Sequence, residues 1–139
     1  MKCSFKAIIL GLLLPAASGA QLTDTIIQGV KIIFSYSPEN FPGDWRNDRI
    51  DAQGQQIATE EIQRSKQITA KALNKYSITL LEYNLKTVYF LKSMQFFGVG
   101  YGGTNSPDAL YMTNNGIALG YTNRYLEQTF HHEFSSILF

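Results

Sequence analysis

Two adjacent residues near the C-terminus, His132 and Glu133, have the types and spacing found in metal-dependent hydrolytic sites. They match the first half of the helical motif H-E-x-x-H, in which two histidines hold zinc and the glutamate deprotonates the metal-bound water. The sequence therefore predicts His132 as a zinc ligand and Glu133 as a general base. Ser136 stands where the motif has its second histidine. Because serine is a poor zinc ligand, we expect zinc binding by this chain to be weak or absent.

The only other histidine is His131, next to the first. At 100° per residue on a helix, His131 and His132 point to different sides, so they are not expected to bind one ion together. His131 instead shares a helix face with Glu127, four residues earlier. That pair is open to two interpretations, a shared metal or a surface ion pair.

Four glycines, Gly98, Gly100, Gly102 and Gly103, form a run that matches G-x-G-x-x-G. A dinucleotide site would need a helix to begin at the last glycine, but the residues at 104–108 are typical of a turn. The alternative is a strand and loop at a sheet edge, where glycines allow another backbone to approach closely. An extended peptide could lie on such an edge, so these glycines are the predicted substrate-binding residues.

Two helices are predicted around these residues. Apolar residues recur at helical spacing over Ile57–Tyr76, where Glu60 is placed to pair with Arg64 at i,i+4. The second helix covers Asn123–Leu138 and carries the His-Glu pair, with Asn123 as its expected N-cap.

The strands are predicted from β-branched and aromatic runs, with a long polar loop at Ser37–Gln56. A bulge or short turn is expected at Lys92–Ser93. The strand-like segments are Val30–Tyr36, Thr87–Leu91, Met94–Val99 and Ala109–Thr113. The predicted fold class is α+β, with a small mixed or mostly antiparallel sheet. Both helices should pack on one face of that sheet, because the chain is too short for helices on both faces.

The first twenty residues, Met1–Ala20, have the order of a secretory signal peptide: two lysines, an apolar stretch and a small-residue end before Gln21. Residues 21–139 would then form one domain, secreted or periplasmic, that contains no cysteine and spans no membrane. The whole chain has a formal net charge of +1. It therefore lacks the basic excess of a nucleic-acid-binding protein.

The order of these elements resembles the N-terminal half of secreted bacterial zinc metallopeptidases of the zincin superfamily. The resemblance covers most of Val30–Phe139 as an order of elements, and only His132-Glu133 as a motif. It implies a zinc-ligand role for His132, a general-base role for Glu133 and a substrate-lining edge strand around residues 97–104. In this family, residues that follow this helix normally contribute a further zinc ligand. A truncated or degenerate member, with HEFSS in place of HExxH, is therefore expected.

Two classes of function remain open. The chain is either a zinc-metallopeptidase-like exported protein, which hydrolyses peptide bonds in a complete form and is inactive as given, or a non-catalytic exported domain. The second would bind a peptide or an envelope partner along the glycine-rich edge. Zinc affinity separates the two, because one imidazole does not make a tight tetrahedral site.

Overall fold

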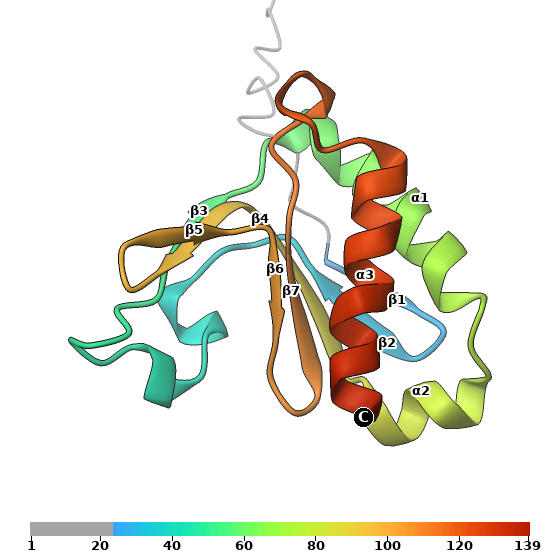
Figure 1. The fold of residues 1–139 in the computed structure, drawn as a ribbon. Helices are drawn as coiled ribbons and strands as arrows, with labels where there is room; N and C mark the ends of the chain where they lie inside the picture. The colour runs from blue at the N-terminus through green and yellow to red at the C-terminus, as the bar shows by residue number, and fades with distance from the viewer. Residues whose placement is uncertain (1–23) are drawn as a thin grey trace, which may run out of the picture.

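A computed structural model describes residues 24–139 (Figure 1). The predicted signal peptide and its cleavage site lie outside the described residues. The described elements, in chain order, are β1 (Thr25–Ile27), β2 (Val30–Ile33), β3 (Gln53–Gln56), α1 (Thr59–Leu73), α2 (Ile78–Asn84), β4 (Thr87–Phe96), β5 (Val99–Tyr101), β6 (Gly103–Asn105), β7 (Ala109–Thr113) and α3 (Asn123–Leu138). Among residues 24–139, no helix has the length and apolar composition needed to cross a bilayer.

The strands form one mixed sheet in the order β1–β2–β4–β7–β6, and β3 and β5 both pair with β4. The central pairs, β2 with β4 and β4 with β7, are parallel, whereas the remaining pairs are antiparallel. Each parallel step needs a long connection, and α1 with α2 supplies the one between β2 and β4. The predicted α+β fold with a small mixed sheet is confirmed.

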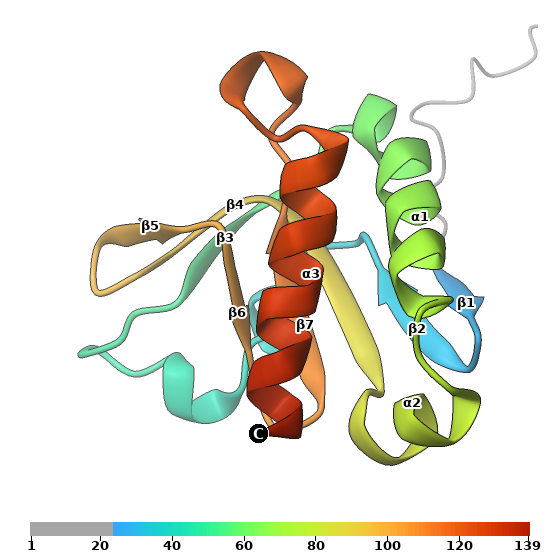
Figure 2. The same cartoon turned by 45° about the vertical axis from the view of Figure 1, so that its right-hand side comes forward.

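Helices α1 and α3 lie side by side on one face of the sheet, as predicted (Figures 1 and 2). Strand residues that point to this face, such as Val88, Phe90 and Leu110, form one core with side chains of the helices, including Leu73 and Phe130. All five are at most 2% exposed. Removing this apolar surface from water is the main term that holds α3 on the sheet.

The opposite face of the sheet is covered by the loop between β2 and β3, which was predicted as a polar loop. Its Phe41 and Trp45 rings contact Phe96 and Tyr111 of the sheet, with centroids 5.3–5.5 Å apart. Two short 3-10 turns, Pro38–Asn40 and Gly43–Trp45, carry these rings inward. The loop therefore forms a second, aromatic core together with the far side of the sheet.

Strand β4 is continuous, whereas two strands were predicted in its place. A register shift against β3 pairs Gln55 with Ser93 and Gln56 with Leu91, so Lys92 has no partner in β3. This is the predicted bulge. One extra residue reverses the alternation of side chains, so the buried residues of the second core change from odd to even numbers along β4. The bulge thereby aims Met94 at the same core as Leu91.

Two local predictions for the helices are wrong. Arg64 pairs with Glu61 at i,i+3 and not with Glu60, because Glu61 lies on the side of α1 where the other partners of Arg64 meet. The N-cap of α3 is Thr122, whose Oγ1 accepts from the Tyr125 N–H at 3.1 Å. Asn123 does not cap the helix, because its Oδ1 accepts instead from Arg64.

Candidate functional site

Helix α3 places the predicted His132 and Glu133 beside the edge strand β6 (Figure 1). Leu126, Phe130 and Phe134 are buried against the sheet and fix the rotation of the helix. Glu133 is consequently turned toward the sheet and only 9% exposed, whereas His132 is exposed. The two predicted site residues thus occupy different environments.

Two of the predicted glycines, Gly102 and Gly103, contact α3 at this point. A Cβ added at Gly103 would lie 2.6 Å from Thr129 Cγ2 and 3.1 Å from Glu133 Cγ, and one added at Gly102 would collide with the Tyr125 hydroxyl. At Gly103 a larger residue would push against Thr129 and Glu133 of α3, whereas at Gly102 the exposed Tyr125 side chain could rotate away.

The Glu133 carboxylate has one hydrogen-bond donor among the described residues. Asn105 of β6 donates from Nδ2 to its Oε2 at 2.8 Å. Within residues 24–139, Glu133 forms no ion pair, and no donor is bound to its Oε1. Glu133 Oε1 is not among the buried side-chain atoms that lack a partner, so it remains open to a donor from solvent or from a ligand.

An open hollow of about 330 Å³ lies between β6 and α3. We call it the α3 hollow. It is lined by Gly102, Gly103, Tyr125, Gln128, Thr129, His132 and Glu133. The structure therefore brings together four of the six predicted site residues.

The remaining two predicted glycines lie away from this hollow. Gly98, with φ +72°, is in the turn between β4 and β5, and Gly100 pairs with Gln95 inside β5. No helix begins at Gly103, which opens strand β6. The glycine run is therefore a hairpin and a sheet edge, as preferred from the sequence, and lacks the strand–helix context of a dinucleotide site.

The donor set around His132 does not fit a complete zinc site. Ser136 Oγ donates to the His132 carbonyl at 3.2 Å, so the residue at the position of the second histidine bonds to its own helix. Within the part of the chain that the structure describes, no three His, Cys, Asp or Glu side chains are grouped around one point. The zinc-ligand role of His132 stays a prediction.

His131 belongs to a separate cluster between α1 and α3, as the helical geometry predicted. Its Nδ1 lies 2.6 Å from the Tyr76 hydroxyl, and its Nε2 is 3.7 Å from Glu127 Oε1. Glu127 also pairs with Lys75 and, at 3.1 Å, with Lys71. Hydrogen bonds from Lys75 and Lys71 lower the pKa of Glu127 to about 2. Glu127 therefore forms ion pairs with two lysines, whereas both interpretations of its contact with His131 stay predictions.

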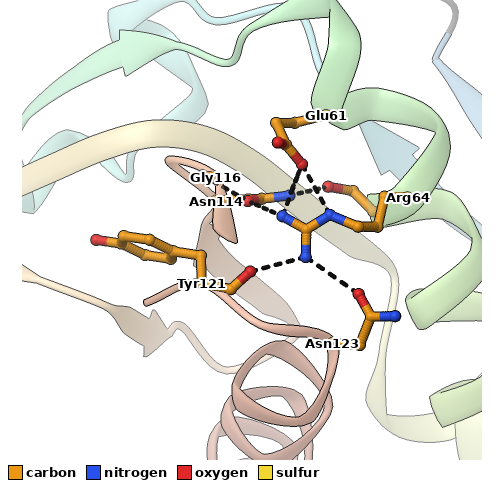
Figure 3. Close-up of polar contacts among 7 residues, drawn as sticks. Glu61, Arg64, Asn114, Gly116, Tyr121 and Asn123 are labelled. Atoms are coloured by element: carbon orange, nitrogen blue, oxygen red, sulfur yellow. Dashed lines mark hydrogen bonds and ion pairs between the residues drawn. The ribbon is translucent and has the colours of Figure 1, made fainter. Parts of the chain in front are cut away.

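A network around Arg64 fixes the start of α3 relative to α1 (Figure 3). The guanidinium donates to Asn114 Oδ1 at 2.9 Å, the Tyr121 carbonyl at 2.7 Å and Asn123 Oδ1 at 3.1 Å, while pairing with Glu61. This network was not predicted from the sequence. From the sequence, Asn114 was recognised only as part of a turn. In the structure its side chain is fully buried and accepts a hydrogen bond from Arg64.

The outer edge of β6 carries unpaired backbone groups. Thr113 donates to the Gly102 carbonyl, and Ser106 donates to the Ala109 carbonyl, so the even-numbered residues of this segment face β7. Hydrogen bonding alternates along an antiparallel strand. The N–H and C=O groups of Gly103 and Asn105 therefore point away from the sheet, where no strand within residues 24–139 pairs with them.

A second hollow, of about 170 Å³, opens on the opposite face of β6 from α3. We call it the aromatic hollow. The sequence did not predict this hollow, because its lining residues come from three separate segments of the chain. It is lined by Trp45, Ile50, Phe96, Phe97, Tyr101 and Thr104.

No protein-family model matches this chain, and neither a curated protein nor a solved structure shows significant similarity to it.

Proposed function

We propose that the chain is an exported, metallopeptidase-like domain that binds an extended peptide along the free edge of β6. The observation that carries this proposal is the outward backbone of Gly103 and Asn105 directly beside the α3 hollow. An added strand would pair its own N–H and C=O groups with these, which is the usual way an extended peptide adds to an exposed sheet edge.

Binding is favoured over hydrolysis for the chain as given. His132 and Glu133 stand where the resemblance to zincins places a ligand and a base, and both line the α3 hollow. Hydrolysis by that mechanism needs several protein ligands on the metal, and Ser136 is hydrogen-bonded to its own helix. Capture of a peptide needs only the edge and the hollow.

Amide NMR of the isotope-labelled chain tests the proposal directly. A capped, extended peptide of alternating threonine and serine with one central lysine-phenylalanine pair should shift the amide signals of Gly103 and Asn105 and slow their hydrogen exchange. Gly29, in the turn between β1 and β2, serves as the internal control. The same peptide with N-methyl groups on the amides that face β6 should not bind, because it lacks the donors of the strand pairing.

Whether the bound peptide is cleaved distinguishes a peptidase from a binding domain. With zinc added, mass spectrometry should recover the peptide intact after prolonged incubation. Cleavage that a chelator stops and that Glu133→Gln abolishes would replace the binding proposal by a peptidase. Unchanged amides at Gly103 and Asn105 at saturating peptide would refute binding at this edge.

A further inference from the structure

The two hollows lie on opposite faces of β6, and two neighbouring residues of β6 border them, one on each face. Gly103 faces Thr129 and Glu133 of α3, whereas the next residue, Thr104, lines the aromatic hollow. Side chains of an extended strand alternate between faces. A peptide paired with β6 would therefore direct successive side chains alternately toward the α3 hollow and the aromatic hollow.

We infer that the peptide bound at β6 carries a basic side chain directed to Glu133 and, at an odd spacing from it, an aromatic or large apolar side chain directed to the aromatic hollow. This inference rests on the proposed function, and it names the class of peptide. Two independent observations support it, one for each hollow.

The first observation is the free carboxylate oxygen of Glu133 at the α3 hollow. Its side chain is buried beside β6, its Oε2 is held by Asn105, and no lysine or arginine among the described residues pairs with it. Glu133 Oε1 has no donor among the described residues and lines the open α3 hollow, so a group of a bound ligand can reach it. A lysine ammonium or arginine guanidinium of a ligand would supply the missing donor at Oε1. Acidic side chains would be repelled.

The second observation is the exposure of Phe97 and its apolar neighbours at the aromatic hollow. Phe97 has φ +55°, a left-handed conformation that is unfavourable for a bulky side chain. Its N–H donates to the Ile50 carbonyl at 2.7 Å, which holds the turn in place. The ring remains 56% exposed, and Val99 and Tyr101 beside it are 58% and 41% exposed. Phe97 and Gly98 form the two-residue turn of the β4–β5 hairpin, in which both residues take a positive φ, so the conformation of Phe97 belongs to the turn. The group of exposed apolar side chains beside the hollow is what favours an apolar group of a ligand.

Capped peptides that differ at one position test both parts. The reference is Ac-Ser-Thr-Lys-Phe-Thr-Ser-amide, and its variants replace lysine by norleucine, replace phenylalanine by serine, or insert threonine between the two. Each variant should bind the wild-type chain about tenfold more weakly in fluorescence anisotropy, because it loses a charge pair, an apolar contact or the alternation of faces.

Chain variants complete a double-mutant cycle. In Glu133→Gln, the lysine and norleucine peptides should bind equally, and in the control Glu60→Gln, which removes an exposed carboxylate of α1, their difference should persist. Phe97→Asn removes the ring but suits a left-handed conformation, so it should fold and lose the preference for phenylalanine. Circular dichroism verifies the fold of each variant.

The outcomes separate this inference from the proposed function. Equal binding of all four peptides to the wild-type chain, with Gly103 and Asn105 still shifted, would overturn the inference and leave the edge site intact. A lysine preference that survives Glu133→Gln would equally overturn it. Absence of binding by every peptide would overturn both.

Discussion

At the scale of single residues, neighbours in the sequence have separate roles because a helix separates them in space. His131 contacts Tyr76 in the connection between α1 and α2, His132 lines the α3 hollow, and Glu133 is buried against β6. Helical geometry predicts this divergence, since adjacent positions differ by 100°. Helical spacing also places Glu133 on the face of Leu126 and Phe130, which is buried. The bond from Asn105 was not predictable, because it depends on how closely the glycines let α3 approach β6.

Glu127 predicts how the chain responds to acid. Its pKa is lowered from 4.5 to about 2 in the folded protein by hydrogen bonds from Lys75 and Lys71. A lowered folded-state pKa stabilises the protein above the unfolded value, and this contribution is lost as pH falls through the window from about 5 to about 2. Glu127→Gln should therefore be less stable than wild type at neutral pH, and the difference should shrink across that window.

Urea unfolding at a series of pH values measures this difference. Because the ion pairs are at the surface, added salt should also reduce it. Glu60→Gln, which removes a carboxylate that pairs with no described basic residue, is the control and should follow the wild-type curve. A difference between Glu127→Gln and wild type that stays constant from neutral to acid pH would contradict the pairing with Lys75 and Lys71.

At the scale of elements, segments with a clear apolar pattern were predictable, and segments without one were not. Helix α3 has the predicted bounds, and β7 spans the predicted Ala109–Thr113. Helix α2 has only seven residues, too few to show a clear period, and β3 is the polar segment Gln53–Gln56, stabilised by pairing with β4 and not by strand propensity. Both elements depend on contacts with distant residues, which the local sequence does not show.

Arg64 joins three elements, so its replacement should affect more than one of them. Arg64→Lys keeps the charge but loses the planar array of donors that reaches Glu61, Asn114 and the Tyr121 carbonyl together. Buried Asn114 would be left with unsatisfied groups. We expect a loss of about 2 kcal/mol in the free energy of unfolding, the scale of one or two charged hydrogen bonds.

Chemical denaturation measures this loss, and amide NMR locates it. The amides of residues 121–123, at the start of α3, should shift most. Arg124→Lys is the matched control, because Arg124 is exposed on α3 and should tolerate lysine with a change below about 0.5 kcal/mol. Equal stability of the two variants would show that the Arg64 network does not hold α3 on α1.

At the scale of the whole molecule, the sheet separates an aliphatic core under the helices from an aromatic core under the loop. The first is the usual product of amphipathic helices on a sheet and was predictable from periodicity. The second depends on Phe41 and Trp45 in a polar loop and on the bulge at Lys92, which turns Met94 and Phe96 toward them. No single segment of the sequence shows this core.

The aromatic core predicts a response to alkali. Burial, with the neighbouring Tyr89 and Asp108, raises the pKa of Tyr111 far above its ordinary value of 10.0. Its hydroxyl donates to the Asn40 carbonyl at 2.7 Å and holds the covering loop on the sheet. A raised folded-state pKa means that the unfolded chain loses its proton first. The stability that the neutral phenol provides is therefore complete below about pH 10 and is lost as pH rises beyond it.

Tyr111→Phe should show this in two ways. At neutral pH it loses the bond to Asn40, at a cost of about 1 kcal/mol in the free energy of unfolding. Above about pH 10 its stability should fall less steeply than that of wild type, because one buried phenol no longer ionises on unfolding. Urea unfolding between neutral and strongly alkaline pH measures both slopes, with Tyr83→Phe, at a tyrosine that is 84% exposed, as the control. Parallel curves for wild type and Tyr111→Phe would mean that Tyr111 does not couple ionisation to unfolding, and that the loop covers the aromatic core less tightly than the ring contacts indicate.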